Sequence, residues 1–538
     1  MTLRPSVGVM SWVNRGFILL NRYAVVASIF VGVVALSLRL LLLLVIARPQ
    51  PFLDDEFSYL LAADTFSHGR LTNPTHPMWI HFETFHELMH PTYASRYPPG
   101  MGLMLALGQV VFHDPWAAVL VGMAVLCGLI TWALWGWLPP RWAIAGGLIA
   151  ALQLTGSYWS ESYWGGTLAA IGGALVAGAL ARLMRQPAAA SSLAFGLGLA
   201  ILANSRPYEG LVFGALCTVF LLVRLRLLVQ RGYQSYSGLV RSVGLPIAYV
   251  LLPTLIWMAT YNYRVTGSPL LMPYKLYERQ YTSWSPFLLS NKPRPEPRYN
   301  HEIFHFYWVV MAMGQQSYRD HILYNHLKNI LELIFFFLPL PVLFCVLLGG
   351  KNLIRNRRLR IPLALLLLFY LGLAVEPNLF PHYFAPATVL VFLIAAAAVQ
   401  DFLSRFAPGK SRMIALGVLC CCMVSLPRDP FFQSPPPQLL LHRREFIANR
   451  NFVLKKLENE PGQILVFVRY QKPLFEEEWV HNDADIDGSR IVWAHAMPGG
   501  KDEELLWYYP NRRAWLLELY DYSKLTLVPM NAERDVAH

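Results

Sequence analysis

The run AVVASIFVGVVALSLRLLLLLVIA, from Ala24 to Ala47, contains a single charged residue, Arg39. The hydrocarbon core of a bilayer is about 30 Å thick, and about 20 apolar residues cross it as a helix. The run is too long for a signal peptide and lacks a clear small-residue cleavage site. Arg4, Arg15 and Arg22 precede it. We therefore expect a retained first span with a cytoplasmic N-terminus.

The rest of the chain has the same apolar character. Of its 538 residues, 55% are hydrophobic and 14% are charged, whereas a soluble domain carries roughly 25% charged residues. The composition predicts an α-helical polytopic membrane protein with about 11 or 12 spans. The candidate spans are residues 24–47, 99–113, 117–137, 142–157, 164–184, 190–204, 208–223, 242–262, 329–350, 361–376, 380–400 and 412–426.

Basic residues between these segments predict which loops are cytoplasmic. Lys+Arg 45 against Asp+Glu 33 gives a net charge of +12, and basic loops between spans are typical of the cytoplasmic side. The loops 48–98 and 263–328 and the segment 427–538 are then external. Nucleic acid is not an expected partner, because no basic run is interleaved with stacking aromatic residues in a polar domain. The basic clusters are Arg182/Arg185, Arg224 to Arg231, Lys351 to Arg360 and Arg405 to Arg412.

The alternation of sides fails at one place. Three apolar segments, 99–113, 117–137 and 142–157, lie between two points that should both be external. Only two complete crossings fit there, so one of the three is a half-span or lies along the interface. The sequence does not identify which.

The polar segment 427–538 differs in composition from residues 1–426, and we expect it to form a separate external domain. The run Ser434 to Gln438 is a predicted stiff linker. Short apolar runs alternate with helical patterns after it, which indicates a small α/β domain. The predicted strands are Ile464 to Val468, Ile491 to Ala494 and Ala514 to Leu519, and the predicted helices are Arg443 to Asn459 and Lys501 to Tyr509.

The strongest chemical signal is PFLDDEFSY, Pro51 to Tyr59, directly after the first span. Its adjacent carboxylates, Asp54, Asp55 and Glu56, repel one another, and partial burial raises carboxylate pKa values. Such a cluster can supply a general base or, with a metal, a cation site. The alternative is a solvated boundary in which Asp54 or Asp55 caps the next helix.

The order of segments after the cluster resembles the GT-C superfamily of polytopic glycosyltransferases, which includes the protein O-mannosyltransferase-like and aminoarabinose transferase-like proteins. In that family an Asp-Glu pair begins a juxtamembrane helix, and a Pro-Pro pair begins the second span. Asp55, Glu56 and Tyr59 match the first element, and the run Tyr97 to Pro99 matches the second. The resemblance covers roughly residues 20–400.

Further external residues fit a glycosyl pocket. Aromatic rings stack on sugar faces, and the family has a second acidic residue in an external loop, for which SYWSESYWGG (Ser157 to Gly166) is the candidate. The alternatives are an interfacial aromatic belt, an internal Arg206–Glu209 ion pair, and solvated or interfacial cations. The predicted substrate-binding residues are Tyr59, Arg96, Tyr97, Glu161, Tyr163, Trp164, Arg206, Tyr208, Glu209, Lys275, Arg279, His382 and Tyr383.

The resemblance implies an inverting transferase of the bacterial inner membrane with a polyprenyl-phosphate sugar donor and an acceptor that is a lipid, glycan or protein. Asp55, with Asp54 and Glu56 beside it, would be the catalytic base. No obligatory metal is expected, although a divalent ion is possible, because no His-rich ligand set adjoins the acidic cluster in sequence. An ion-coupled transporter and a non-catalytic scaffold with an external binding domain remain the alternatives.

Overall fold

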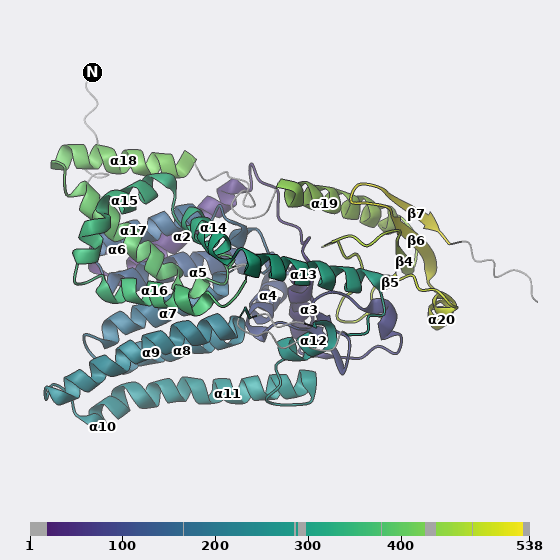
Figure 1. Ribbon diagram of the computed structural model, residues 1–538, viewed down its shortest axis with the longest axis horizontal. Coiled ribbons are helices and arrows are strands. Elements are labelled where there is room, and N and C mark those ends of the chain that lie inside the picture. Colours follow the sequence, from purple (N-terminus) through teal and green to yellow (C-terminus); the bar gives the residue numbers. More distant parts are fainter. Residues whose placement is uncertain are drawn as a thin grey trace, which may run out of the picture.

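The computed structural model describes residues 19–164, 166–283, 287–288, 297–377, 379–424, 437–475 and 477–530. The predicted boundary at residue 426 and most of the predicted linker, Ser434 to Gln438, lie outside these residues. Within them, the predicted apolar segments are helices, and Figure 1 shows these helices gathered at one end of the molecule, away from the C-terminal sheet.

The apolar segments correspond closely to helices, and several of these helices begin at a proline. Pro115, Pro140 and Pro207 stand at the first turn of their helices, where the missing N–H costs no hydrogen bond. The helices are α2 (Ala24–Leu42), α4 (Pro99–Phe112), α5 (Pro115–Trp135), α6 (Pro140–Leu154), α7 (Thr167–Leu183), α8 (Ala189–Ser205), α9 (Pro207–Gln230), α11 (Leu245–Thr266), α16 (Arg360–Leu373), α17 (Thr388–Leu403) and α18 (Pro408–Val424).

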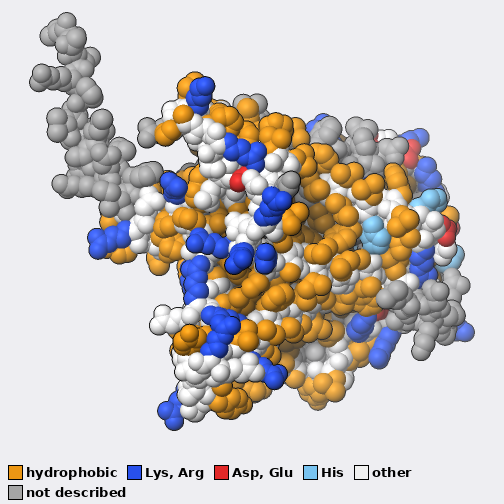
Figure 2. Space-filling model, turned by 60° about the vertical axis from the view of Figure 1, so that its left-hand side comes forward, with side chains coloured by type: hydrophobic (Ala, Val, Ile, Leu, Met, Phe, Trp, Pro, Cys, Tyr) orange, Lys and Arg blue, Asp and Glu red, His pale blue; other side chains and the backbone are white. Residues whose placement is uncertain are grey.

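Length and apolarity make the chain an integral membrane protein. Among the described residues, 5 helices are long and apolar enough to cross a bilayer, or 6 if one bent pair is a single span, and four shorter helices are also apolar. Much of their outer surface is hydrophobic (Figure 2), including exposed Leu107, Val219 and Leu347. Such exposed apolar side chains suit contact with lipid tails.

The bent pair corrects one predicted span. Residues 329–350 form two helices, α14 (Ile322–Phe337) and α15 (Leu340–Arg355), which meet at an angle of 116°. Leu338, between them, has an extended backbone and precedes Pro339. A residue before proline avoids the helical conformation, so the chain turns there and continues in a new direction.

The structure also identifies which of the three crowded segments stays on one side. Asp114, after the end of α4, is hydrogen-bonded to Arg48, which follows α2. At its other end, Gly100 lies against the carbonyl of Asn204 at the end of α8. Both ends of α4 are therefore at the same end of the bundle, and α4 packs along α3 (Asp54–Ser67), where a Cβ on Gly102 would lie 2.6 Å from that of Ala62.

The predicted external loops hold the short elements between the bundle and the C-terminal sheet (Figure 1). In the first loop, β3 (Thr92–Ser95) pairs antiparallel with β1 (Asn73–Pro74) and β2 (Glu87–Leu88). The remaining elements of these loops are η1 (Trp79–Phe82), α12 (Pro273–Tyr281) and the longer α13 (Glu302–Asp320). Four short elements lie outside the loops 48–98 and 263–328: η2 (Tyr158–Ser160) before α7, α10 (Tyr236–Leu239) and η3 (Val240–Gly244) before α11, and η4 (Ala385–Ala387) before α17.

The C-terminal part is the predicted α/β arrangement with one additional strand. The strand order is β5-β4-β6-β7; β4 is parallel to β5 and β6, and β7 is antiparallel to β6. The predictions of β4, β5 and β6 are confirmed, and β7 was missed. The elements are α19 (Pro437–Glu458), β4 (Ile464–Tyr470), β5 (Ile491–His495), α20 (Lys501–Tyr508), β6 (Arg513–Leu519) and β7 (Leu525–Pro529).

Candidate active site

Glu56 is a structural member of the acidic turn that begins α3. Its Oε2 accepts hydrogen bonds from the backbone N–H groups of Phe52 at 3.0 Å and Leu53 at 3.2 Å. Its Oε1 accepts one from the N–H of Tyr163 at 3.0 Å. These three bonds occupy both carboxylate oxygens of a side chain that is 1% exposed. Glu56, rather than Asp54 or Asp55, therefore caps the helix and ties it to the loop before α7.

Replacing Glu56 with Ala is expected to destabilise the protein more than it changes the chemistry of Asp55. The change leaves three backbone donors buried without a partner, and each such group costs about 1–3 kcal/mol. The Gln variant keeps one acceptor oxygen and should lose less. Thermal unfolding in detergent measures the order, wild type above Gln above Ala. Equal midpoints for Ala and wild type would contradict this role for Glu56.

Asp55 is the member of the acidic turn that retains access to solvent. Its side chain is 26% exposed, and His86 Nε2 lies 3.8 Å from its Oδ1. The hydroxyl of Tyr97 donates a hydrogen bond to the same oxygen. Burial raises the pKa of Asp55 above its ordinary value of 3.8, and the positive charges of Arg96 and Arg206 partly offset this rise. Tyr97 thus fixes the carboxylate of Asp55, and part of that carboxylate is accessible to solvent.

Arg96 connects Asp55 to a wall of tyrosine rings. Its Nη2 donates to the hydroxyl of Tyr97 at 2.9 Å, and its guanidinium lies 4.9 Å from the ring centroids of Tyr97 and Tyr274 and 4.8 Å from that of Tyr277. The ring of Tyr59 stacks on that of Tyr97 with centroids 4.4 Å apart. The predicted residues Tyr59, Arg96 and Tyr97 therefore surround Asp55.

Asp54 faces the C-terminal part of the chain. It is 4% exposed, and its Oδ1 lies 3.5 Å from Nε2 of His481. The imidazole of His481 stacks on Phe57 with centroids 3.9 Å apart. The sequence predicts neither this histidine nor His86 as a neighbour of the cluster. His86 lies in the first external loop, 31 residues after Asp55, and His481 lies in the C-terminal part of the chain, so neither adjoins the acidic cluster in sequence.

A second group of charges centres on Arg206, between α8 and α9. Its Nη1 lies 3.8 Å from Oε1 of Glu209, and its guanidinium lies 4.9 Å from the ring centroid of Tyr383. Burial and the nearby charge of Glu209 raise the pKa of Glu376. The predicted residues Arg206, Glu209 and Tyr383 thus lie together, and Glu376 is an addition to the predicted set.

His382 lies beside this group as a neutral imidazole. Its Nδ1 is 2.8 Å from the hydroxyl of Tyr158, and Trp164 packs on its ring at a centroid distance of 4.3 Å. Burial, with the charge of Arg206, holds the pKa of His382 well below its ordinary value of 6.5. Its buried Nε2 has no hydrogen-bond partner among the described residues. The predicted substrate-binding residue His382 thus lies beside Arg206 and Trp164, with its pKa shifted away from the charged form.

Two solved structures share this architecture over nearly the whole chain. ArnT from Cupriavidus metallidurans, bound to undecaprenyl phosphate, has a TM-score of 0.52 and 12% identity over 98% of this chain and 99% of its own. Its apo state has a TM-score of 0.51, also with 12% identity, over 97% and 98%. The chain has the GT-C fold.

The oligosaccharyltransferase from Archaeoglobus fulgidus, in a complex with zinc and sulfate, has a TM-score of 0.45 and 12% identity over 91% of this chain and 67% of its own. No family model matches the chain, and no curated protein matches it. The GT-C resemblance is confirmed at the level of the fold. The expectation that the Pro-Pro pair begins the second span is wrong, because the helix that begins there, α4, has both ends at the same end of the bundle.

Within this GT-C fold, some predicted site residues make structural contacts away from Asp55. Glu161 Oε1 lies 3.5 Å from Nη1 of Arg39 in the first span, and both side chains are buried. The other contacts are those of Tyr163, whose N–H binds Glu56; Tyr208, whose hydroxyl donates to the carbonyl of Gly372; and Lys275, which pairs with Glu278 at 2.8 Å. Arg279, on α12 with Lys275, is exposed.

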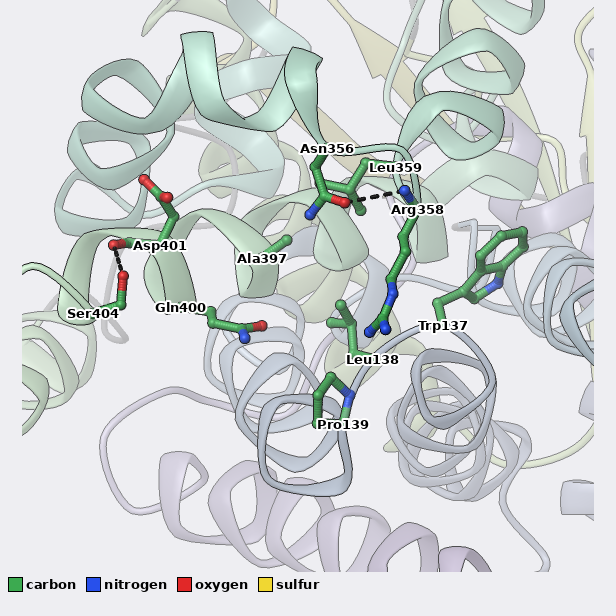
Figure 3. Close-up of a pocket in the computed structure, with 10 residues that line it drawn as sticks. All are labelled: Trp137, Leu138, Pro139, Asn356, Arg358, Leu359, Ala397, Gln400, Asp401 and Ser404. Carbon is green, nitrogen blue, oxygen red and sulfur yellow. Dashed lines mark hydrogen bonds between the residues drawn. The ribbon is translucent and has the colours of Figure 1, made fainter.

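Among the described residues, neither a cluster of metal-ligating side chains nor the cavity shown in Figure 3 lies at the acidic turn. Among the described residues, no group of three or more His, Cys, Asp and Glu side chains could hold a metal ion. A cavity of ≈ 220 Å³ lies between Trp137, Arg358 and Gln400 (Figure 3). These residues belong to the helix ends predicted to be cytoplasmic, and none of the predicted site residues lines the cavity.

Proposed function

We propose that the chain is an inverting glycosyltransferase that moves a sugar from a polyprenyl-phosphate donor to an acceptor hydroxyl. The observation that carries the proposal is Asp55, a partly exposed carboxylate that is held by Tyr97 and flanked by Arg96. The pKa of Asp55 is raised by burial, which makes its carboxylate a better proton acceptor. ArnT, with the same fold, was solved with undecaprenyl phosphate, which supports a donor of this class.

The proposed reaction is one displacement at the anomeric carbon. The carboxylate of Asp55 accepts the proton of the acceptor hydroxyl, and the oxygen of that hydroxyl forms the new bond to the anomeric carbon. The bond from this carbon to the phosphate oxygen breaks on the opposite face, so the configuration inverts. The polyprenyl phosphate leaves with the bonding electron pair, and its added charge requires a nearby cation.

Arg206 is the proposed cation for the leaving phosphate. It lies at the same end of the bundle as Asp55 and contributes to the electrostatic field at that carboxylate. Its ion pair with Glu209 has an N–O distance of 3.8 Å, which is long for a hydrogen-bonded pair. Planar guanidinium groups bind phosphate oxygens in pairs, so a phosphate can draw Arg206 away from this loose contact.

Membranes that contain the chain, supplied with a panel of radiolabelled polyprenyl-phosphate sugars, test the function. We expect the labelled sugar to move from the polyprenyl phosphate to an acceptor. We expect membranes that contain the Asp55→Asn variant to lack this transfer. The same assay with a chelator tests whether a divalent metal contributes. An absence of turnover together with solute or ion flux in liposomes would instead support a transporter.

We further propose that the acidic turn and the C-terminal sheet are external and that the loop Lys351 to Arg360 is cytoplasmic. Five basic side chains in that loop favour the cytoplasm. In a cysteine-free background, a Cys at exposed Ser523 should react with an impermeant maleimide from the outside, and a Cys at exposed Asn356 should react only after permeabilisation. The reverse pattern would overturn the orientation and place the acidic turn on the wrong side for an external acceptor.

A further inference from the structure

The C-terminal part of the chain forms one side of the acidic turn. Ala484 donates its backbone N–H to Oδ2 of Asp64 on α3 at 2.8 Å, and the hydroxyl of Tyr93 in the first loop donates to the carbonyl of Asn482 at 3.0 Å. The loop between β4 and β5, which holds His481, therefore lies directly against α3. This loop covers the end of the helix that carries Asp54 and Asp55.

His481 is held between the acidic turn and the first loop. Its Nε2 lies 3.5 Å from Oδ1 of Asp54, with both side chains 4% exposed. Its Nδ1 lies 3.3 Å from Oγ1 of Thr84. Burial and the charge of Arg450 hold the pKa of His481 well below its ordinary value of 6.5. The imidazole is therefore neutral, and its Nε2 lies in close polar contact with Oδ1 of Asp54 at a distance longer than a usual N–H···O hydrogen bond.

Aromatic and cationic contacts fix the same turn. The rings of His481 and Phe57 are stacked and nearly parallel, with an interplanar angle of 5° and a centroid distance of 3.9 Å. The guanidinium of Arg450, from α19, lies 4.9 Å from the centroid of Phe57 and donates to the carbonyl of Trp479 at 3.3 Å. Asp54 and Phe57 stand on either side of Asp55 in the first turn of α3. Both are therefore in contact with the C-terminal part of the chain, through His481 and Arg450.

We propose that His481 is a positioning residue for Asp55, through Asp54, so that the C-terminal domain completes the acidic turn of the transferase. The proposal rests on the proposed function above. A carboxylate that takes a proton in the transition state must be held closely to its geometry, and a displacement of 1 Å can lower the rate by about 10²-fold. Glu56 fixes the turn from the membrane side, and His481 fixes it from the domain side.

Three variants test the proposal in steady-state kinetics of the full-length protein. His481→Ala should lower kcat by about 10- to 10²-fold with little change in the donor KM. His481→Gln, which retains an N–H near the position of Nε2, should recover part of that loss. In an Asp54→Asn background, His481→Ala should have a smaller effect, because residues in contact are not additive.

His76→Ala is the matched control for docking of the domain. His76 is also a buried histidine at this interface, with Nε2 3.1 Å from Oδ1 of Asp487 and 3.2 Å from the hydroxyl of Tyr509. Its loss should lower thermal stability and leave kcat within about twofold, since it does not touch the acidic turn. Equal kcat values for His481→Ala and His76→Ala, or full additivity with Asp54→Asn, would overturn the positioning role.

Hydrogen–deuterium exchange separates this proposal from the proposed function. His481→Ala should speed exchange of the backbone amides of residues 53–60, whereas His76→Ala should not. If the wild-type protein showed no turnover and His481→Ala still sped the exchange of residues 53–60, the transferase proposal would be contradicted and the structural link between His481 and the turn would stand. Turnover that Asp55→Asn abolishes and His481→Ala leaves unchanged would retain the transferase and remove the positioning role.

Discussion

Replacing Asp55 with Asn is expected to lower sugar transfer by at least about 10²-fold, the lower end of the range for loss of a general base. The amide has the shape of the carboxylate and still accepts a hydrogen bond from Tyr97, so folding and membrane insertion should be unchanged. The measurement is initial transfer rate at saturating donor, with size-exclusion profiles as the folding check. Near-normal turnover would exclude Asp55 as the base.

The pH profile provides a second reading of the same variant. A general base works only when deprotonated, and burial raises the pKa of Asp55 above 3.8. Transfer should therefore fall as the pH drops through this raised pKa and be restored above it. The residual activity of the Asn variant should lack this acid limb. Asp54→Asn should keep the limb and lose less activity, because Asp54 is buried against His481.

The sequence treats the three adjacent carboxylates as equivalent, and the structure separates them by direction. Successive residues on an α-helix point about 100° apart, so Asp54, Asp55 and Glu56 face three different neighbourhoods. They meet His481, the Tyr97–Arg96 pair and the backbone of residues 52–53, respectively. The family motif selected Asp55 as the candidate base, and Asp55 is the partly exposed member of the three. The structural task of Glu56 depends on Tyr163, which only tertiary folding brings near.

A charged residue inside an apolar run predicts a buried partner of opposite charge, and the sequence interpretation did not use this signal. Arg39 is a buried cation in the first span, and such residues are almost always paired. Its partner is Glu161 at 3.5 Å, which explains why Glu161 stands in an aromatic external segment without joining Asp55. The broken span also had a sequence signal, because Pro339 stands inside the predicted span 329–350. In contrast, no local pattern links His481 to Asp54, because their contact joins two polar segments at opposite ends of the chain.

The membrane part was predictable because every crossing needs a long apolar run, and this constraint acts on local sequence. This constraint does not say whether a short apolar helix crosses the membrane or stays on one side of it. Helix α4 is apolar, but the Arg48–Asp114 contact shows that its C-terminal end lies at the same end of the bundle as its N-terminal end. The packing of α4 on α3, with Gly102 against Ala62, explains why an apolar helix stays there: it covers the helix that bears the acidic turn.

Replacing Arg206 with Ala is expected to raise the donor KM by about 10- to 10²-fold and to change the acceptor KM much less. A hydrogen bond to a charged group contributes about 1.5–3 kcal/mol, and each 1.4 kcal/mol corresponds to a factor of about 10 in affinity. Arg206→Lys should fall between the two, because it keeps the charge and loses the planar pair of donors. Donor and acceptor are varied separately in steady-state kinetics.

Arg264→Ala controls for a general loss of positive charge at this end of the molecule. Arg264 lies in the last turn of α11, where it is exposed, and its loss should change the donor KM less than about twofold, as expected for a screened surface charge. Arg206→Ala also leaves Glu209 without its cation, so Arg206→Ala combined with Glu209→Gln removes that unpaired charge. If the double variant recovered the wild-type donor KM, the effect of Arg206 would arise from Glu209 and not from phosphate binding. A donor KM that stays high in both variants is the result that assigns the leaving phosphate to Arg206, because only a lost contact with the donor survives the removal of the unpaired carboxylate.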